Sequence, residues 1–149
     1  MSNIKEEVVN ELHKPARRKF KRRKVIIRGL YHLWQADLVE MQHYTKFNKG
    51  NRYILIVIDT FSKYVWAEPV KSKTVKDVTE AMKKIIIDAK KSPKNLHTDR
   101  GKEFLGENFQ KLMKENNINH YSTFSNLKAS IVERVNRTLK NKMWKQFSI

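Results

Sequence analysis

The order of two hydrophobic periodicities constrains the fold of this chain more than any other feature of its sequence. Strand-like segments occupy residues 32–41, 53–59, 63–70, 94–98 and 118–122. Helical spacing of apolar side chains appears in three further segments, which run from Thr74 to Ser92, over residues 104–115, and from Ser130 onward. The order is three strands, helix, strand, helix, strand and helix, which predicts a mixed α/β domain.

Local signals add detail to this layout. The tight connection "DTFS" (59–62) between two strand segments favours an antiparallel hairpin. Thr74 and Asp77 form a Thr-x-x-Asp pattern, which resembles a capping box with a shorter acid in its third position. Ser92 and Pro93 are expected to end the helix that begins there.

The segment before residue 30 is expected to be an arm outside the core domain of residues 30–149. Residues 4–12 have the spacing of a short helix. They precede "KPARRKFKRRK" (14–24), in which eight of eleven residues are Lys or Arg. Such a block is a solvated tether, a nucleic-acid contact or a nuclear import signal, and the last two favour a nuclear protein.

Charge and cysteine usage exclude several classes of protein. The chain carries 32 Lys and Arg against 15 Asp and Glu, a net charge of +17, which favours a polyanionic partner and nucleic acid above all. It has no cysteine, which excludes disulfides and Cys-containing zinc sites within these residues. The apolar runs are too short to span a bilayer, and the N-terminus lacks a signal peptide, so we expect an intracellular protein without a membrane partner.

Three carboxylates stand out against this positive background. Asp37 lies among apolar neighbours in the strand 32–41, where an ionised acid is costly without a cation or several donors. Asp99 directly follows the strand 94–98, a position where open α/β sheets commonly build sites. Glu133 lies in the first turn of the last helix. If the three acids converge, a hard cation must offset their repulsion, and two Mg²⁺ ions about 3.5–4 Å apart would activate a nucleophile.

Each acid also has a structural interpretation that the sequence leaves open. Asp37 is compatible with a core carboxylate paired with an arginine, and Asp99 with an ordinary Asx turn. Glu133 completes an S-x-x-E capping box with Ser130. Asp59 is a fourth candidate, but its place in the "DTFS" connection favours a structural role in the hairpin turn.

The last helix carries two rows of side chains. An apolar row repeats every four residues and predicts a buried stripe, made of Ile131, Val135, Leu139 and Met143. A second row follows a different face and comprises Glu133, Arg137, Lys140 and Trp144. This second face fits either a solvated ion-pair surface or a metal ligand followed by phosphate contacts, and the net charge favours the latter.

Three segments together resemble the catalytic core of integrases from retroviruses, long-terminal-repeat retrotransposons and large DNA transposons. They are "WQADLVEM" (34–41), "HTDRGKEF" (97–104) and "SNLKASIVERVNRTLKNKMW" (125–144). The wording looks closest to the Maverick/Polinton type, including "ELHKPARRKF" (11–20) in the arm. The resemblance covers roughly residues 10–146, and the motifs are specific as a set.

The resemblance implies an RNase H-like fold, in which helices flank a five-stranded mixed sheet. It implies that the acid triad is Asp37, Asp99 and Glu133, binding Mg²⁺ or Mn²⁺, with two ions expected. It implies further that the DNA contacts are Arg137 and Lys140, with Asn136 and Lys128 as less securely matched neighbours.

The implied chemistry is 3′-end processing followed by strand transfer into target DNA, without a covalent enzyme intermediate. The expected partners are the DNA ends of a mobile element, target DNA and further copies of the chain. Family members usually carry an N-terminal zinc domain and often a C-terminal binding module. Neither is in this sequence, so we expect a fragment, an excised core or a degraded copy.

Two other functions remain possible at this point. A domesticated remnant would bind DNA without catalysis, although the chain retains all three acids. An RNase H-like nuclease acting on RNA–DNA hybrids would share the fold and the metals, but "ASIVERVNRTLK" (129–140) matches integrases instead.

Overall fold

The described part of the chain falls into two compact units. A computed structural model describes residues 2–14, 26–122 and 130–148. One unit comprises residues 27–133, and the other comprises residues 1–26 with 134–149. The expected boundary between arm and core at residue 30 stays a prediction.

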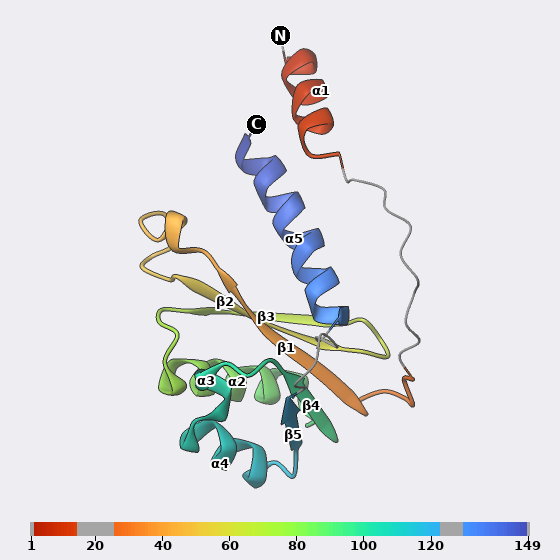
Figure 1. The fold of residues 1–149 in the computed structure, drawn as a ribbon, viewed down its shortest axis with the longest axis vertical. Coiled ribbons are helices and arrows are strands. Elements are labelled where there is room, and N and C mark those ends of the chain that lie inside the picture. The colour runs from red at the N-terminus through yellow and green to blue at the C-terminus, as the bar shows by residue number, and fades with distance from the viewer. Residues whose placement is uncertain (1, 15–25, 123–129, 149) are drawn as a thin grey trace. The chain divides into compact units, whose positions relative to one another are not determined.

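A five-stranded mixed sheet organises the unit of residues 27–133 (Figure 1). Its strands are β1 (Leu33–Glu40), β2 (Tyr53–Asp59), β3 (Val65–Val70), β4 (Asn95–Thr98) and β5 (Asn119–Ser122), in the spatial order β3-β2-β1-β4-β5. The helices are α1 (Ser2–Leu12), η1 (Gln42–Tyr44), α2 (Val75–Ala89), α3 (Lys102–Leu105), α4 (Glu107–Glu115) and α5 (Ser130–Ser148). β1 to β3 pair in antiparallel fashion, whereas β4 runs parallel to β1 and β5 runs parallel to β4.

The hairpin and the helix cap predicted from the sequence are confirmed, whereas α2 ends at Ala89, with Lys90 as its C-cap, before Ser92 is reached. β2 and β3 form an antiparallel hairpin, with Ile58 opposite Val65 next to the turn. Thr74 is the N-cap of α2, because its side chain accepts a hydrogen bond of 3.2 Å from the backbone N–H of Asp77. Ser72 donates a second hydrogen bond, of 2.6 Å, to the Asp77 carboxylate.

Alternation along β1 separates the core from the opposite face of the sheet. Trp34 and Ala36 point into the main hydrophobic core, which α2, α3 and α4 complete with Met82, Ile85, Phe104, Phe109 and Met113. Because successive side chains point to opposite faces, Gln35 and Asp37 lie on the other face. The chemistry-bearing residues of β1 are therefore on the side away from α2.

The segment predicted as one helix over residues 104–115 is two helices, which is a correction. α3 ends at Leu105 and α4 begins at Glu107, with Gly106 between them in an extended conformation. A Cβ atom on Gly106 would overlap the methyl groups of Val75, at the start of α2. Glycine therefore allows the backbone to approach α2 closely, and the chain changes direction there.

The buried row predicted on the last helix is also wrong. Ile131, Val135, Leu139 and Met143 are only partly buried, whereas Val132 is fully buried and Asn136 is 6% exposed. The backbone N–H groups of Ile131 and Val132 donate to the side chain of Gln35. These hydrogen bonds orient the first turn of α5, which turns Val132 rather than Ile131 inward.

The smaller unit joins the start of the chain to most of α5. Its Val9 is buried, while Ile4, Val8 and Leu12 are exposed. His13 Nε2 and Ser148 Oγ lie 3.4 Å apart. No helix in the described ranges combines the length and the apolar character needed to span a bilayer.

Candidate active site at the ends of β1 and β4

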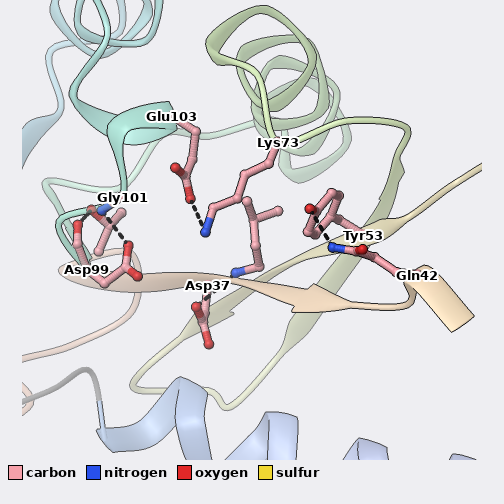
Figure 2. A network of polar contacts seen from close by, with 9 residues as sticks. Asp37, Gln42, Tyr53, Lys73, Asp99, Gly101 and Glu103 are labelled. Atoms are coloured by element: carbon pink, nitrogen blue, oxygen red, sulfur yellow. Dashed lines mark hydrogen bonds and ion pairs between the residues drawn. The ribbon is translucent and has the colours of Figure 1, made fainter.

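The register of two parallel strands brings the first two predicted acids together. In the β1–β4 pair, Gln35 lies opposite His97. Two residues further along both chains, the same register sets Asp37 level with Asp99, just beyond the end of β4. Neighbouring strands lie about 4.8 Å apart, and residues two apart share a face. Figure 2 shows the Asp99 carboxylate turned toward β1, which carries Asp37.

Both aspartates are held in place by nearby backbone N–H groups. Asp37 Oδ1 accepts a hydrogen bond of 2.9 Å from Leu38, and Asp99 Oδ1 accepts one of 3.0 Å from Gly101. The second bond is the Asx turn that the sequence left open for Asp99. A carboxylate has about four acceptor positions, so such a turn is compatible with metal binding by the same group. Asp99 is exposed and Asp37 is partly buried.

A chain of hydrogen bonds ties the backbone of Asp99 to the neighbouring elements. Gln110 Nε2, in α4, lies 2.8 Å from His120 Nδ1, and His120 Nε2 lies 2.8 Å from Thr98 Oγ1. Thr98 Oγ1 then donates to the carbonyl oxygen of Asp99 at 2.8 Å. This order requires the neutral His120 ring to carry its proton on Nε2. Burial first, and His97 second, lower the pKa of His120, which favours that neutral form.

An ion pair between the buried Glu103 and the solvent-exposed Lys73 lies near Asp99 (Figure 2). Glu103 is only 4% exposed and lies 3.4 Å from the Lys73 ammonium. Burial by itself lowers the pKa of Lys73, but the Glu103 charge and hydrogen bond, with the charges of Asp99 and Glu40, raise it overall. A Cβ atom on Gly101 would overlap the Glu103 carboxylate. The glycine therefore makes room for the ion pair beside the Asp99 turn.

The third predicted acid is linked to β1 through the backbone of its own helix. Gln35 Oε1 accepts hydrogen bonds from Ile131 N at 3.1 Å and from Val132 N at 3.0 Å. Glu133 is the next residue along α5 and its side chain is exposed. The start of α5 is thus held against the face of β1 that also carries Asp37. The cap that the structure shows at this helix comes from Gln35.

The three predicted acids have the ligand type that a hard cation prefers, although their carboxylates do not form a closed metal-binding group. Within residues 2–14, 26–122 and 130–148, no group of three or more acidic or histidine side chains is arranged to hold a metal ion. Asp37 and Asp99 are adjacent by strand register, and Glu133 follows the turn held by Gln35. Carboxylate oxygens are the ligands that Mg²⁺ and Mn²⁺ prefer. The residues therefore fit such ions by donor type, and the two aspartates also fit by strand register.

The predicted DNA contacts on α5 differ in their exposure to solvent. Arg137 is exposed and Lys140 is partly buried, whereas Asn136 is almost fully buried. All three belong to the smaller unit, whereas the three acids belong to the unit of residues 27–133. Lys128 lies outside the described residues.

Asp59 has the structural role that the sequence favoured. Its Oδ2 accepts from Tyr31 N at 2.8 Å and Trp34 Nε1 at 3.1 Å. Its Oδ1 accepts from Phe61 N, Ser62 N and Ser62 Oγ at 2.9, 2.8 and 3.2 Å. Although burial alone would raise the pKa of Asp59, these hydrogen bonds lower it.

Sequence reasoning missed the residues that support the acids. They are Gln35, Lys73, Glu103, Gln110 and His120. Only Gln35 left a signal, because it is a polar residue on the same alternating face as Asp37. Lys73 and Glu103 are 30 positions apart in a chain rich in charge, so nothing local indicates their pairing.

Comparison with known proteins gives this geometry a family. The Integrase core domain family matches residues 29–123. A transposon-derived protein of Caenorhabditis elegans is 35% identical over 105 residues, which are 70% of this chain and 37% of that protein. The Gag-Pol polyprotein of woolly monkey sarcoma virus is 34% identical over 119 residues, which are 78% of this chain and 7% of the polyprotein. The chain thus spans well under half the length of these relatives.

Solved structures agree in fold. The integrase catalytic core domain of HTLV-2, solved in complex with magnesium, is 27% identical with a TM-score of 0.61, covering 74% of this chain and 68% of that one. A chain in the structure of the simian T-cell lymphotropic virus intasome in complex with the PP2A regulatory subunit B56 gamma is 27% identical with a TM-score of 0.71, covering 95% of this chain and 53% of that one. The mixed sheet with flanking helices is therefore the RNase H-like fold of integrase cores, and this chain belongs to the Integrase core domain family.

Proposed function

We propose that this chain is the catalytic core of a DNA integrase or transposase, a metal-dependent polynucleotidyl transferase. In the first reaction water cleaves a phosphodiester near the end of a mobile element and frees a 3′-hydroxyl. In the second that hydroxyl attacks a phosphodiester of target DNA, so that a new P–O bond joins the two DNAs and the 3′-oxygen of the target strand leaves as a hydroxyl. The observation that carries the proposal is the parallel register of β1 and β4, which sets Asp37 level with Asp99.

Asp37, Asp99 and Glu133 would hold two Mg²⁺ or Mn²⁺ ions in this proposal. Bound there, the ions would supply Lewis acidity at the phosphate and lower the pKa of the attacking water or hydroxyl. The protein's own contribution is to orient the carboxylates. The Asx turn at Gly101 orients Asp99, and the Gln35 contact sets the start of the helix that carries Glu133.

The positive charge of the chain has a role in binding DNA. Arg137 and Lys140, with Lys128 and Asn136 as further candidates, would contact the phosphate backbone. A net charge of +17 predicts affinity that falls steeply with salt and depends little on sequence. The resemblance also motivates a homo-oligomer, a nuclear location and a Maverick/Polinton-type origin, and these three remain predictions.

A strand-transfer assay tests the proposal directly. Purified protein is mixed with oligonucleotide duplexes that carry candidate element ends and with target DNA, in Mg²⁺, Mn²⁺ or chelator. We expect joined products with either metal and none with chelator. DNA binding without any joining would favour the domesticated remnant. Cleavage restricted to RNA–DNA hybrids would favour the RNase H-like nuclease.

A further inference from the structure

Gln35 occupies an unusual place for an uncharged polar side chain. It lies mid-sheet in β1 and is only 4% exposed. Its Oε1 accepts from the backbone N–H groups of Ile131 and Val132, 96 and 97 residues later in the chain. The first four N–H groups of a helix lack partners within the helix, and a residue just before the helix usually caps them. Here a distant strand supplies the acceptor.

The position of Gln35 connects two parts of the proposed site. Along β1 it is two residues before Asp37 and shares its face. Along α5 its partner Val132 is directly before Glu133. One side chain therefore spans from the strand that carries one proposed ligand to the helix turn that carries another.

We propose that Gln35 is a positioning residue, which fixes the start of α5 so that Glu133 can join Asp37 and Asp99 at a shared divalent cation. This inference rests on the proposed function. Gln35 acts through the helix backbone and does not itself touch the substrate. Its hydrogen bonds hold the start of the helix against the strand that carries Asp37.

The chemistry of the side chain explains why a glutamine suits this position. A carboxylate would also accept from the helix N–H groups, but it would add another negative charge beside Asp37. Asparagine has the same amide on a side chain that is one methylene shorter. Methionine matches glutamine in length and volume but offers only a weak acceptor. These three replacements separate the reach, the charge and the acceptor strength of Gln35.

The experiment compares Gln35→Met with the matched control Gln42→Met in the full chain. Gln42 lies in η1, just after β1, and its amide donates to the Tyr53 hydroxyl at 3.0 Å. Amide hydrogen exchange is measured at Ile131 and Val132, with Asn95 N, which donates to His32 O, as an internal reference for the sheet. Mn²⁺ affinity is measured by calorimetry without DNA.

In Gln35→Met we expect exchange at Ile131 and Val132 to become roughly tenfold faster, while Asn95 keeps its protection. Mn²⁺ affinity is expected to fall about 10- to 100-fold, as for outer partners of metal ligands. Gln42→Met is expected to change neither quantity. Gln35→Glu retains an oxygen acceptor of the same reach, so exchange protection at Ile131 and Val132 should return. If Gln35→Met also loses protection at Asn95, the sheet itself is disturbed, and the test then depends on Gln35→Glu. Recovered protection at Ile131 and Val132 in Gln35→Glu supports the role of the side-chain acceptor, and no recovery contradicts it.

Unchanged exchange at Ile131 and Val132 in Gln35→Met would overturn the inference. So would lost protection with Mn²⁺ affinity equal to that of the unmodified protein, because the contact would then be structural only. If the unmodified protein itself binds no Mn²⁺, the proposed function fails and takes the positioning role with it. Intact binding in the unmodified protein with no effect of Gln35→Met overturns the positioning role alone.

Discussion

The aspartates at the two ends of strand β1 differ in burial and in the number of hydrogen bonds they accept. Near its start, Asp59 of the neighbouring strand is 1% exposed and accepts five hydrogen bonds. A cavity of about 300 Å³ lies at that end, bordered by Asp59, Tyr31 and Trp66. At the other end Asp99 is exposed, and its carboxylate accepts from Gly101 within its own turn.

The difference teaches how to separate structural acids from acids that serve chemistry. The donors around Asp59 stabilise its negative charge without an ion, so this carboxylate serves to hold the fold together. The turn around Asp99 orients the carboxylate but leaves it open to solvent. An acid with few donors next to a second acid is suited to a cation. The cavity of about 300 Å³ lies instead at the end of β1 where the hydrogen bonds of Asp59 are already satisfied.

The largest effect is expected from Asp99→Asn. This substitution keeps the size of the side chain and the acceptor for Gly101 but removes the charge. Strand transfer in Mg²⁺ should fall by more than about 100-fold, beyond the loss typical for an outer partner of a metal ligand. Binding to duplex DNA should change little. Strand transfer by Asp99→Asn at the rate of the unmodified protein would show that Asp99 is not needed for the chemistry, and the contrast with Asp59 would be lost.

Asp59→Ala should instead affect stability. It removes the acceptor for five donors, one of them buried and four partly buried, and we expect the free energy of unfolding to fall by about 2–3 kcal/mol. Urea denaturation followed by circular dichroism measures this loss. Because the folded pKa of Asp59 lies below its unfolded value, its contribution is present above about pH 4 and is lost as the pH falls further. An Asp59→Ala variant as stable as the unmodified protein would show that Asp59 has no structural role.

Gly101→Ala sharpens the description of the open end. The added Cβ overlaps the Glu103 carboxylate, so the ion pair with Lys73 must shift. We expect a loss of about 1–3 kcal/mol in stability, as for other overpacked sites, with a reduced rate of strand transfer. Gly29→Ala is the control, because a Cβ atom there meets nothing within 4 Å. Equal behaviour of the two variants would show that the ion pair does not constrain the turn.

Arg137→Ala and Lys140→Ala separate DNA binding from the acid site. Each should weaken DNA binding at all sequences and reduce the slope of log affinity against log salt by about 1. Titrations at several salt concentrations measure the slope, and Lys142→Ala, at an exposed lysine on the same helix, serves for comparison. An unaltered slope would mean that the substituted side chain makes no phosphate contact.

The smallest effect is expected from the histidine in the Gln110–His120–Thr98 chain. Burial and His97 lower the folded pKa of His120, so protonation opposes folding. Its contribution to stability is therefore full above the unfolded pKa of about 6.5 and is lost as the pH falls through the folded value. The unfolding free energy of the unmodified protein should decrease below that pH, and His120→Gln should flatten this dependence. Parallel pH profiles for the two proteins would contradict the assignment.

Much of the fold was predictable because the local signals agreed with one another. The strand at residues 53–59 and the cap at Thr74 appear where the sequence indicated them. The break at Gly106 was not predictable, because its cause is Val75, a residue brought close only by folding. The inward side of α5 was misjudged for the same reason, since Gln35 of β1 decides it.

The candidate site was predictable in its residue types and less so in its arrangement. Their positions in and just after predicted strands, together with the family resemblance, indicated Asp37 and Asp99, and the strand register sets them level. The pairing of Lys73 with Glu103 depends on a loop and a turn that meet only in three dimensions. Sequence patterns carry the alternation within one strand but not the distances between elements.

The strict alternation in β1 has a consequence for how the gene can change. Trp34 and Ala36 fill the core from one face, while Gln35 and Asp37 project from the other. Inserting or deleting a single codon among these four would exchange the two rows and send the acid into the oily interior. Evolution can therefore substitute single residues in this stretch, but it cannot change the number of residues.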